Sequence, residues 1–183
     1  MKTLAVYCGA AHGANPFYAD AARLLAASLV EHNIGLVYGG GKVGLMGVIA
    51  DEVLRLGGEA TGVIPKALVE REVGHAGLTR LFVVKDMHER KAMMADLSEG
   101  FIAMPGGMGT LEELFEMVTW AQLGIHAKPI GLYNANGFWD GLVSFVRHQC
   151  EEGFVRPEHL GLMQVDADPD ALIRRLRAAC VPA

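Results

Sequence analysis

The sequence predicts an α/β fold: a single Rossmann-like, doubly wound domain with a mainly parallel sheet flanked by helices. Short β-type runs alternate with longer helical patterns, which is typical of βαβ units around a parallel sheet. The length of 183 residues suits one domain spanning 1–183, because domains typically hold about 100–200 residues. Hydrophobic residues make up 51% of the chain and charged residues 20%, a composition that predicts a compact core.

The individual elements can be placed in order along the chain. We expect strands at residues 4–8, 35–38, 60–64, 80–84, 100–104 and 129–133. The first helix is predicted to begin with Asn15 as its cap and Pro16 at the first helical position, where a missing N–H costs nothing. We expect later helices to begin near Gly44, Asp86, Thr110, Gly137 and Asp168. The irregular stretch 65–78 is expected to form a loop over a site.

Composition and charge narrow the range of partners. The net charge of −5 argues against nucleic acid, whose phosphate backbone needs a clustered basic face. No apolar stretch approaches the roughly 18–20 residues needed to span a bilayer, so we expect no membrane partner. The apolar share is high for so short a chain, which predicts that part of it covers a subunit interface in a homodimer.

Cysteine and histidine usage indicates the compartment and argues against a metal. Cys8, Cys150 and Cys180 are far apart and odd in number, which predicts reduced thiols. The first residues form a strand-like run rather than a secretory signal, so we expect a cytoplasmic protein. The seven histidines show no metal-ligand spacing, and we expect neither a metal nor a cofactor.

The strongest motif is the segment 105–113, Pro-Gly-Gly-Met-Gly-Thr-Leu-Glu-Glu, which follows the fifth predicted strand. Glycines let the backbone approach a ligand, and the N–H groups at the start of the next helix attract an anion such as phosphate. Thr110 and Glu113 also fit a capping box, in which Glu113 serves only the start of the helix. Both interpretations remain open, and they are compatible.

A second glycine loop lies at 38–47, after the second predicted strand. It formally contains the dinucleotide pattern G-x-G-x-x-G. However, the acidic residue about 20 positions on, Glu59, stands at the beginning of the next strand instead of its end, where a ribose would be bound. The functional hypothesis is that Gly40 and Gly41 contact a phosphate or sugar, and a plain tight turn is the alternative.

Two adjacent cations, Arg90 and Lys91, fall in the first turn of a predicted helix that Asp86 and Glu89 cap. Cations there oppose the helix dipole, so the pair predicts an anion nearby, although a solvated surface pair is the alternative. Glu72, in the irregular stretch, could reach over the same rim or lie in solvent.

These motifs resemble the LOG (Lonely Guy) cytokinin-activating phosphoribohydrolases, a family often labelled lysine decarboxylase-like. The resemblance covers roughly residues 5–125 and includes the first Cys-Gly loop, the second glycine loop, Met-His-Glu-Arg-Lys at 87–91 and PGGxGTxxE at 105–113. It implies a dimeric Rossmann-like enzyme that hydrolyses N6-modified adenosine 5′-monophosphates to the free cytokinin base and ribose 5-phosphate. The sequence departs from the family at Ala10-Ala11, where serines are frequent, and at Met108, where tyrosine is frequent.

The resemblance also implies site residues. Its catalytic arginine and glutamate correspond to Arg90 and Glu113. Its substrate contacts correspond to Glu72, Lys91, Gly106, Gly107, Met108, Gly109, Thr110, Leu111, Glu112 and Thr119.

A mechanism and two rival functions follow from the motifs. Cleavage of an N-glycosidic bond develops positive charge on the ribose ring, so we expect the 105–113 loop to hold the 5′-phosphate while Glu113 stabilises that charge or activates water. Arg90 is expected to orient the ribose, the phosphate or the water. The rivals are a non-enzymatic nucleotide or molybdenum-cofactor carrier, which needs no Arg90–Glu113 pair, and an NAD-dependent oxidoreductase, which depends on the weak G-x-G-x-x-G pattern.

Overall fold

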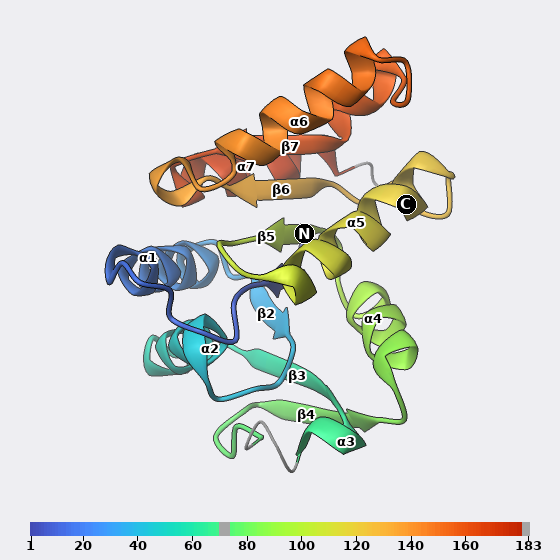
Figure 1. Ribbon diagram of the computed structural model, residues 1–183. Helices are drawn as coiled ribbons and strands as arrows, with labels where there is room; N and C mark the ends of the chain where they lie inside the picture. The colour runs from blue at the N-terminus through green and yellow to red at the C-terminus, as the bar shows by residue number, and fades with distance from the viewer. Residues whose placement is uncertain (70–73, 181–183) are drawn as a thin grey trace.

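The computed structural model describes residues 1–69 and 74–180 and contains one seven-stranded sheet in the order β4-β3-β2-β1-β5-β6-β7 (Figure 1). Every pair of neighbouring strands in it is parallel. The strands are β1 (Thr3–Tyr7), β2 (Gly35–Tyr38), β3 (Ala60–Pro65), β4 (Arg80–Val84), β5 (Phe101–Ala103), β6 (Ile130–Tyr133) and β7 (Met163–Asp166). The predicted α/β, doubly wound fold class is confirmed.

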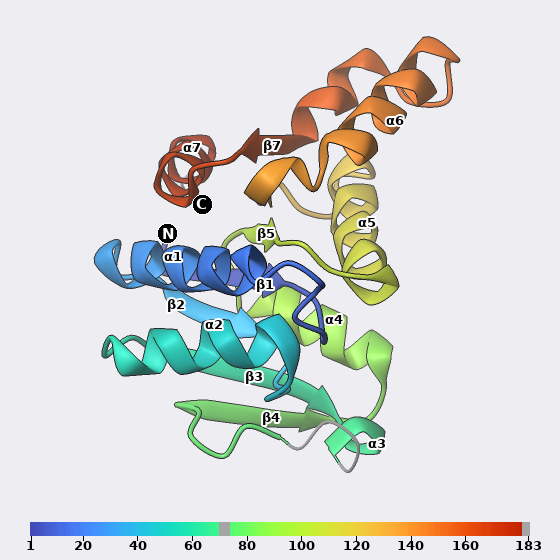
Figure 2. The same cartoon turned by 60° about the vertical axis from the view of Figure 1, so that its left-hand side comes forward.

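Helices cover both faces of the sheet (Figure 2). On one face lie α1 (Phe17–Glu31), α2 (Gly44–Arg55) and α7 (Pro169–Ala179), and on the other α4 (Met87–Asp96), α5 (Met108–Gln122) and α6 (Asp140–Glu151). The short α3 (Lys66–Val69) and two 3₁₀ turns, η1 (Ala135–Gly137) and η2 (Pro157–Leu162), complete the described elements.

The alternation of side chains along each strand divides the core between these two helical layers. On β1, Leu4 and Val6 pack with α1, α2 and α7, while Ala5 and Tyr7 pack with α4, α5 and α6. Successive strand residues point to opposite faces, and a parallel sheet covered on both faces needs apolar residues on both. This requirement explains the nearly continuous hydrophobic run of β1.

Boundaries of the expected elements agree with the structure within a few residues, but one described helix and one described strand were not expected. The helix is the short α3 (Lys66–Val69), which lies in the stretch 65–78 that was expected to be an irregular loop. The strand is β7, which was not expected because its sequence Met-Gln-Val-Asp has no apolar run and all four residues are only partly buried at the sheet edge. Helix α6 begins at Asp140 instead of near Gly137, because η1 intervenes and places Asn136 and Gly137 at positive φ. Helix α1 begins at Phe17, whose N–H donates to the Asn15 side chain at 3.0 Å.

The strand order reverses direction between β1 and β5. After β1 the chain adds strands outward through β2, β3 and β4, then returns to the other side of β1 with β5. In open α/β sheets, ligands bind outside the carboxyl ends of the strands at such a switch point, because the two adjacent loops diverge there. The topology therefore places a crevice above β1 and β5.

Candidate active site

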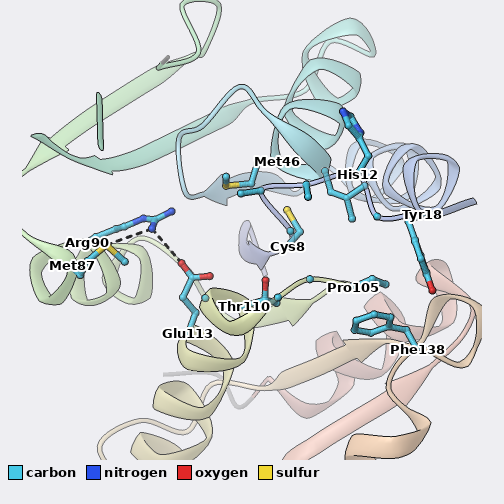
Figure 3. A pocket seen from close by; sticks show the side chains of 18 residues that line it. Cys8, His12, Tyr18, Met46, Met87, Arg90, Pro105, Thr110, Glu113 and Phe138 are labelled. Carbon is cyan, nitrogen blue, oxygen red and sulfur yellow. Dashed lines mark hydrogen bonds and ion pairs between the residues drawn. The ribbon is translucent and has the colours of Figure 1, made fainter. Parts of the chain in front are cut away.

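A cavity of about 510 Å³ lies at the carboxyl ends of β1 and β5 (Figure 3). Two backbone segments line it, the loop after β1 (8–13) and the loop after β5 with the first turn of α5 (105–107 and 109–110), together with residues 45–46 of α2. Single side chains complete the lining: Tyr18, Met87, Arg90, Glu113 and Phe138. Its size falls in the usual range for small-molecule sites, about 300–1,000 Å³.

The N-terminus of α5 forms one wall of this cavity. The N-cap residue is Gly107 and the helix begins at Met108. The first N–H groups of an α-helix have no partner within the helix and carry the positive end of its dipole, which makes this end a suitable site for an anion. Gly106 allows the loop to pass this close, since a Cβ there would lie 2.1 Å from Thr110 Oγ1 and 2.9 Å from Gly9 N.

The position of Gly107 corrects the capping-box interpretation. A capping box requires Thr110 to be the N-cap, but Thr110 is the third residue inside the helix. The sequence left the capping box open as one of two interpretations, and the structure excludes it because Met108 and Gly109 already belong to the helix. Glu113 therefore lies one turn beyond Thr110 on the same helix face, and both residues line the cavity.

The side chain of Arg90 is buried where β3 and the loop after β2 adjoin the cavity. The residue is 7% exposed. Its Nε donates to the Val63 carbonyl at 3.1 Å and its Nη2 to the Gly39 carbonyl at 3.2 Å. Its Nη1 lies 3.7 Å from Glu113 Oε1, an ion pair between α4 and α5 (Figure 3). The sequence predicts an anion near Arg90, and part of that negative charge comes from the Glu113 carboxylate.

The second glycine loop has a role that the sequence did not suggest. A Cβ on Gly39 would lie 1.9 Å from Arg90 Nη2, so the absence of a side chain makes room for the guanidinium. Gly40 packs against β3 and β4, and Gly41 forms a bridge with Gly74. Neither Gly40 nor Gly41 is among the residues that line the cavity, so their predicted contact with a ligand remains a prediction.

Lys91 and Glu112 lie away from the cavity lining and contact each other. The Lys91 ammonium pairs with Glu112 and, at 3.1 Å, with Glu116. Burial alone would lower the pKa of Lys91, but hydrogen bonds and charge from the two carboxylates outweigh burial and raise it. Lys91 is therefore a charged, paired group between α4 and α5, and its predicted contact with substrate stays untested.

The other predicted substrate contacts differ in where they lie. Gly106, Gly107, Gly109 and Thr110 line the cavity. Three others lie on α5 outside the lining: Met108 and Thr119 are exposed, and Leu111 is partly buried. Glu72 falls outside the described residues.

Two aromatic residues of the cavity were not expected from the sequence. Tyr18 from α1 and Phe138, which directly follows η1, meet edge to face, with ring centroids 5.8 Å apart. They lie at the opposite end of the cavity from Arg90 and Met87 (Figure 3). The one available signal was the place of Phe138 shortly after the sixth strand, where a parallel sheet directs its ligands. Tyr18 has the spacing of an ordinary helix residue.

The cysteine in the cavity is held in its thiol form. Burial, followed by the nearby charge of Glu113, raises the pKa of Cys8 well above its usual range. Since the thiolate is the nucleophile, Cys8 is a small apolar wall here and not an attacking group. In the described part of the chain, no group of three or more His, Cys, Asp or Glu side chains gathers in a way that could hold a metal ion.

The fold and the cavity together define a Rossmann-like α/β protein with a helix N-terminus open to a cavity at its topological switch point. The pattern of a protein family described as "Possible lysine decarboxylase" matches residues 46–176. The chain is 48% identical over 176 residues to the probable cytokinin riboside 5′-monophosphate phosphoribohydrolase LOGL2 of Oryza sativa subsp. japonica, covering 96% of this chain and 72% of that protein. It is 47% identical over 176 residues to the cytokinin riboside 5′-monophosphate phosphoribohydrolase LOG1 of Arabidopsis thaliana, covering 96% of this chain and 83% of that one. The chain belongs to this LOG family.

Solved structures of molybdenum-cofactor proteins share the fold. The molybdenum cofactor carrier protein of Chlamydomonas reinhardtii matches with a TM-score of 0.69 at 21% identity, over 96% of this chain and 98% of its own. The molybdenum cofactor binding protein of Rippkaea orientalis matches with a TM-score of 0.72 at 18% identity, over 98% of this chain and 97% of its own. At such low identity, these matches concern the architecture alone. Among the described residues, no helix is both long and apolar enough to cross a membrane.

Proposed function

We propose that this protein hydrolyses the N-glycosidic bond of N6-modified adenosine 5′-monophosphates, releasing the free cytokinin base and ribose 5-phosphate. The observation that carries the proposal is a buried carboxylate, Glu113, paired with Arg90 in a cavity whose neighbouring wall is the N-terminus of α5. The names of the curated relatives, which specify this reaction for those proteins, support it.

The substrate's 5′-phosphate is expected at the N-terminus of α5. There the unpaired N–H groups and the helix dipole favour negative charge, and the Thr110 hydroxyl can add a hydrogen bond. Glu113 lies three residues beyond Thr110, a rise of about 4.5 Å along the helix at 1.5 Å per residue. A phosphate that contacts the Thr110 hydroxyl therefore brings the attached ribose next to this carboxylate.

Glu113 and Arg90 then act on the ribose. As the bond to the base breaks, positive charge develops on the sugar, and the Glu113 carboxylate stabilises it or activates the attacking water. Arg90 has its Nε and Nη2 tied to carbonyls. Its Nη1 remains directed toward Glu113 and the cavity, which suits orienting the ribose, the phosphate or the water.

The rest of the cavity suits a planar base. Met46 and Met87 offer flexible apolar surface near Arg90, and Tyr18 and Phe138 offer aromatic surface at the other end. A carrier would need the anion site without the Arg90–Glu113 pair, so the pair favours the enzyme. The hypothesis of an NAD-dependent oxidoreductase is disfavoured, because the G-x-G-x-x-G loop makes room for Arg90 and does not line the cavity.

The deciding experiment is incubation of the purified protein with AMP and with isopentenyladenosine 5′-monophosphate, following the base and ribose 5-phosphate by chromatography. Glu113→Gln, nearly the same shape, serves as the matched variant. We expect release by the wild type and a loss of at least about 100-fold in the variant, since positioned acid–base groups contribute roughly 10²–10⁴-fold. Wild-type turnover by Glu113→Gln would refute the role of Glu113. Binding without turnover would favour the carrier.

The active form is proposed to be a homodimer in the cytoplasm. Leu123 and Ile125 after α5, and Phe145 and Phe154 on and after α6, are 56–85% exposed. These two helices lie on the same face of the sheet, and exposed apolar surface marks interaction sites. Cys8, Cys150 and Cys180 are free thiols, as expected in a reducing compartment. Light scattering of the purified protein tests the dimer, which a monomeric mass would rule out.

A further inference from the structure

A second ionic contact joins α4 to α5 directly beside the Arg90–Glu113 pair. Lys91, the neighbour of Arg90, pairs with Glu112, the neighbour of Glu113, and also with Glu116 at 3.1 Å. The two helices that carry the proposed catalytic groups are thus connected twice, once inside the cavity and once outside its lining.

Lys91 is the buried member of this contact. Its side chain is 5% exposed, whereas those of Glu112 and Glu116 are 53% and 22% exposed. A buried ammonium is costly unless carboxylates compensate for its lost hydration. The two glutamates supply that compensation, so the position of Lys91 depends on α5 although the residue belongs to α4.

The charged groups between α4 and α5 pair with one another. In the described structure, Arg90 and Lys91 from α4 are ion-paired with three carboxylates of α5, Glu112, Glu113 and Glu116. The phenol of Tyr7 lies near the same acids, but burial, followed by the charges of Glu113 and Glu116, raises its pKa well above the usual range. Tyr7 is therefore neutral and adds no negative charge beside them.

We propose that Lys91, held by Glu112 and Glu116, is a positioning residue that fixes α4 against α5 and thereby sets the separation of Arg90 and Glu113. This inference deepens the phosphoribohydrolase function and rests on it. It differs from a direct substrate contact, because Lys91 acts through the two neighbouring residues and its amine is occupied by protein carboxylates. Misplacement of a catalytic group by about 1 Å can cost about 100-fold in rate.

Four proteins test the proposal: the wild type, Lys91→Met, the double variant Glu112→Gln/Glu116→Gln, and the triple variant. We expect Lys91→Met to lower kcat for AMP about 10- to 100-fold with KM changed less than about threefold. The double variant should lose a similar factor although its lysine is intact, and the triple should be no worse than Lys91→Met. Arg55→Met, which breaks the surface pair of Arg55 with Glu52, is the control and should retain full activity.

A direct contact with substrate gives the opposite pattern. It predicts a raised KM in Lys91→Met, near-normal kinetics in the double variant, and losses that multiply in the triple, and any of these results overturns the proposal. If Lys91→Met does not fold, the double variant decides alone, because it leaves the amine in place. The free energies of unfolding of the same four proteins, measured with urea and without substrate, should change non-additively. If the wild type shows this non-additivity but cleaves no substrate, the proposed function is refuted. The structural coupling of α4 to α5 through Lys91 is then still supported.

Discussion

The guanidinium of Arg90 lies across the backbone of Gly39, donates to the Gly39 and Val63 carbonyls, and ends 3.7 Å from Glu113. Arg90 and Glu113 are 23 positions apart in the chain. A glycine outside the cavity lining therefore controls where the arginine of the site can lie. At the scale of single residues, the site depends on the space left by one missing side chain.

Gly39→Ala tests this dependence. The new methyl group would lie 1.9 Å from Arg90 Nη2, and the end of an arginine side chain can move away at modest cost in stability. We expect kcat for AMP to fall about 100-fold, because the guanidinium is displaced, while the melting temperature changes little. Gly141→Ala, where a Cβ would meet nothing within 4 Å, is the control. Undiminished kcat in Gly39→Ala would show that the position of Arg90 is unimportant.

Cys8 provides a second test at this scale. Because burial and then Glu113 raise its pKa, the thiolate fraction of Cys8 at pH 8 is negligible, and alkylation requires the thiolate. We expect iodoacetamide at pH 8 to modify the partly exposed Cys150 and Cys180 and to spare Cys8 until the protein is unfolded. Peptide mass spectrometry measures each site. Modification of Cys8 at the rate of Cys150 would contradict this view of the cavity.

At the scale of elements, the start of α5 decides what its residues do. With Gly107 at the N-cap, Gly109 and Thr110 lie in the first turn and Glu113 in the second. The sequence indicated the helix and its anion-binding end, but it placed the start two residues late. Helix starts are set by tertiary contacts as well as local preference, and here the close approach of Gly106 to Gly9 fixes the loop.

Gly109→Asp separates anion binding from helix stability. A Cβ at Gly109 would meet nothing within 4 Å, and a carboxylate in the first turn interacts favourably with the helix dipole by about 0.3–1 kcal/mol. The same carboxylate repels a phosphate at the helix end. We expect an unchanged or higher melting temperature and a KM for AMP raised at least about tenfold.

Gly109→Asn, of similar size and uncharged, is the matched variant and should raise KM much less. Equal KM values for the Asp variant and the wild type would place the phosphate elsewhere in the cavity.

At the scale of the whole molecule, large apolar side chains are exposed on both sides of the sheet, and those with the greatest exposure lie on the α5–α6 side. The proposed dimer surface consists of Leu123, Ile125, Phe145 and Phe154 and lies on the α5–α6 side. Phe154, at 85%, is among the most exposed apolar side chains of the described chain. A partner that covers this surface would also be close to the helix that carries Glu113.

The double variant Leu123→Lys/Ile125→Lys tests this surface. Charged residues at the core of an interface oppose association, because they must lose hydration without a partner. We expect the dissociation constant of the proposed dimer, measured by sedimentation velocity, to rise at least about tenfold. Leu24→Lys, on the exposed face of α1 at 56% exposure, should leave the dimer intact. Equal dissociation constants for the two variants would show that the α5–α6 surface is not the dimer interface.

The sequence by itself determined the α/β class, six of the seven strands, the Asp86 cap of α4 and the glycine-rich start of α5. These features depend on local signals, namely the alternation of apolar runs, the hydrogen bonds of capping side chains, and the freedom of glycine. The resemblance to the LOG family added the names Arg90 and Glu113, but not the way in which the two meet.

Only the tertiary structure decided which residues share the cavity. The Arg90–Glu113 contact, the space above Gly39, the pairing of Lys91 with Glu112 and Glu116, and the Tyr18–Phe138 contact all join distant parts of the chain. Such contacts depend on the order in which parallel strands assemble and on how the helices pack on each face. A periodicity read along one segment contains no information about that order, which is why the sequence did not indicate that Gly39 lies against the Arg90 guanidinium.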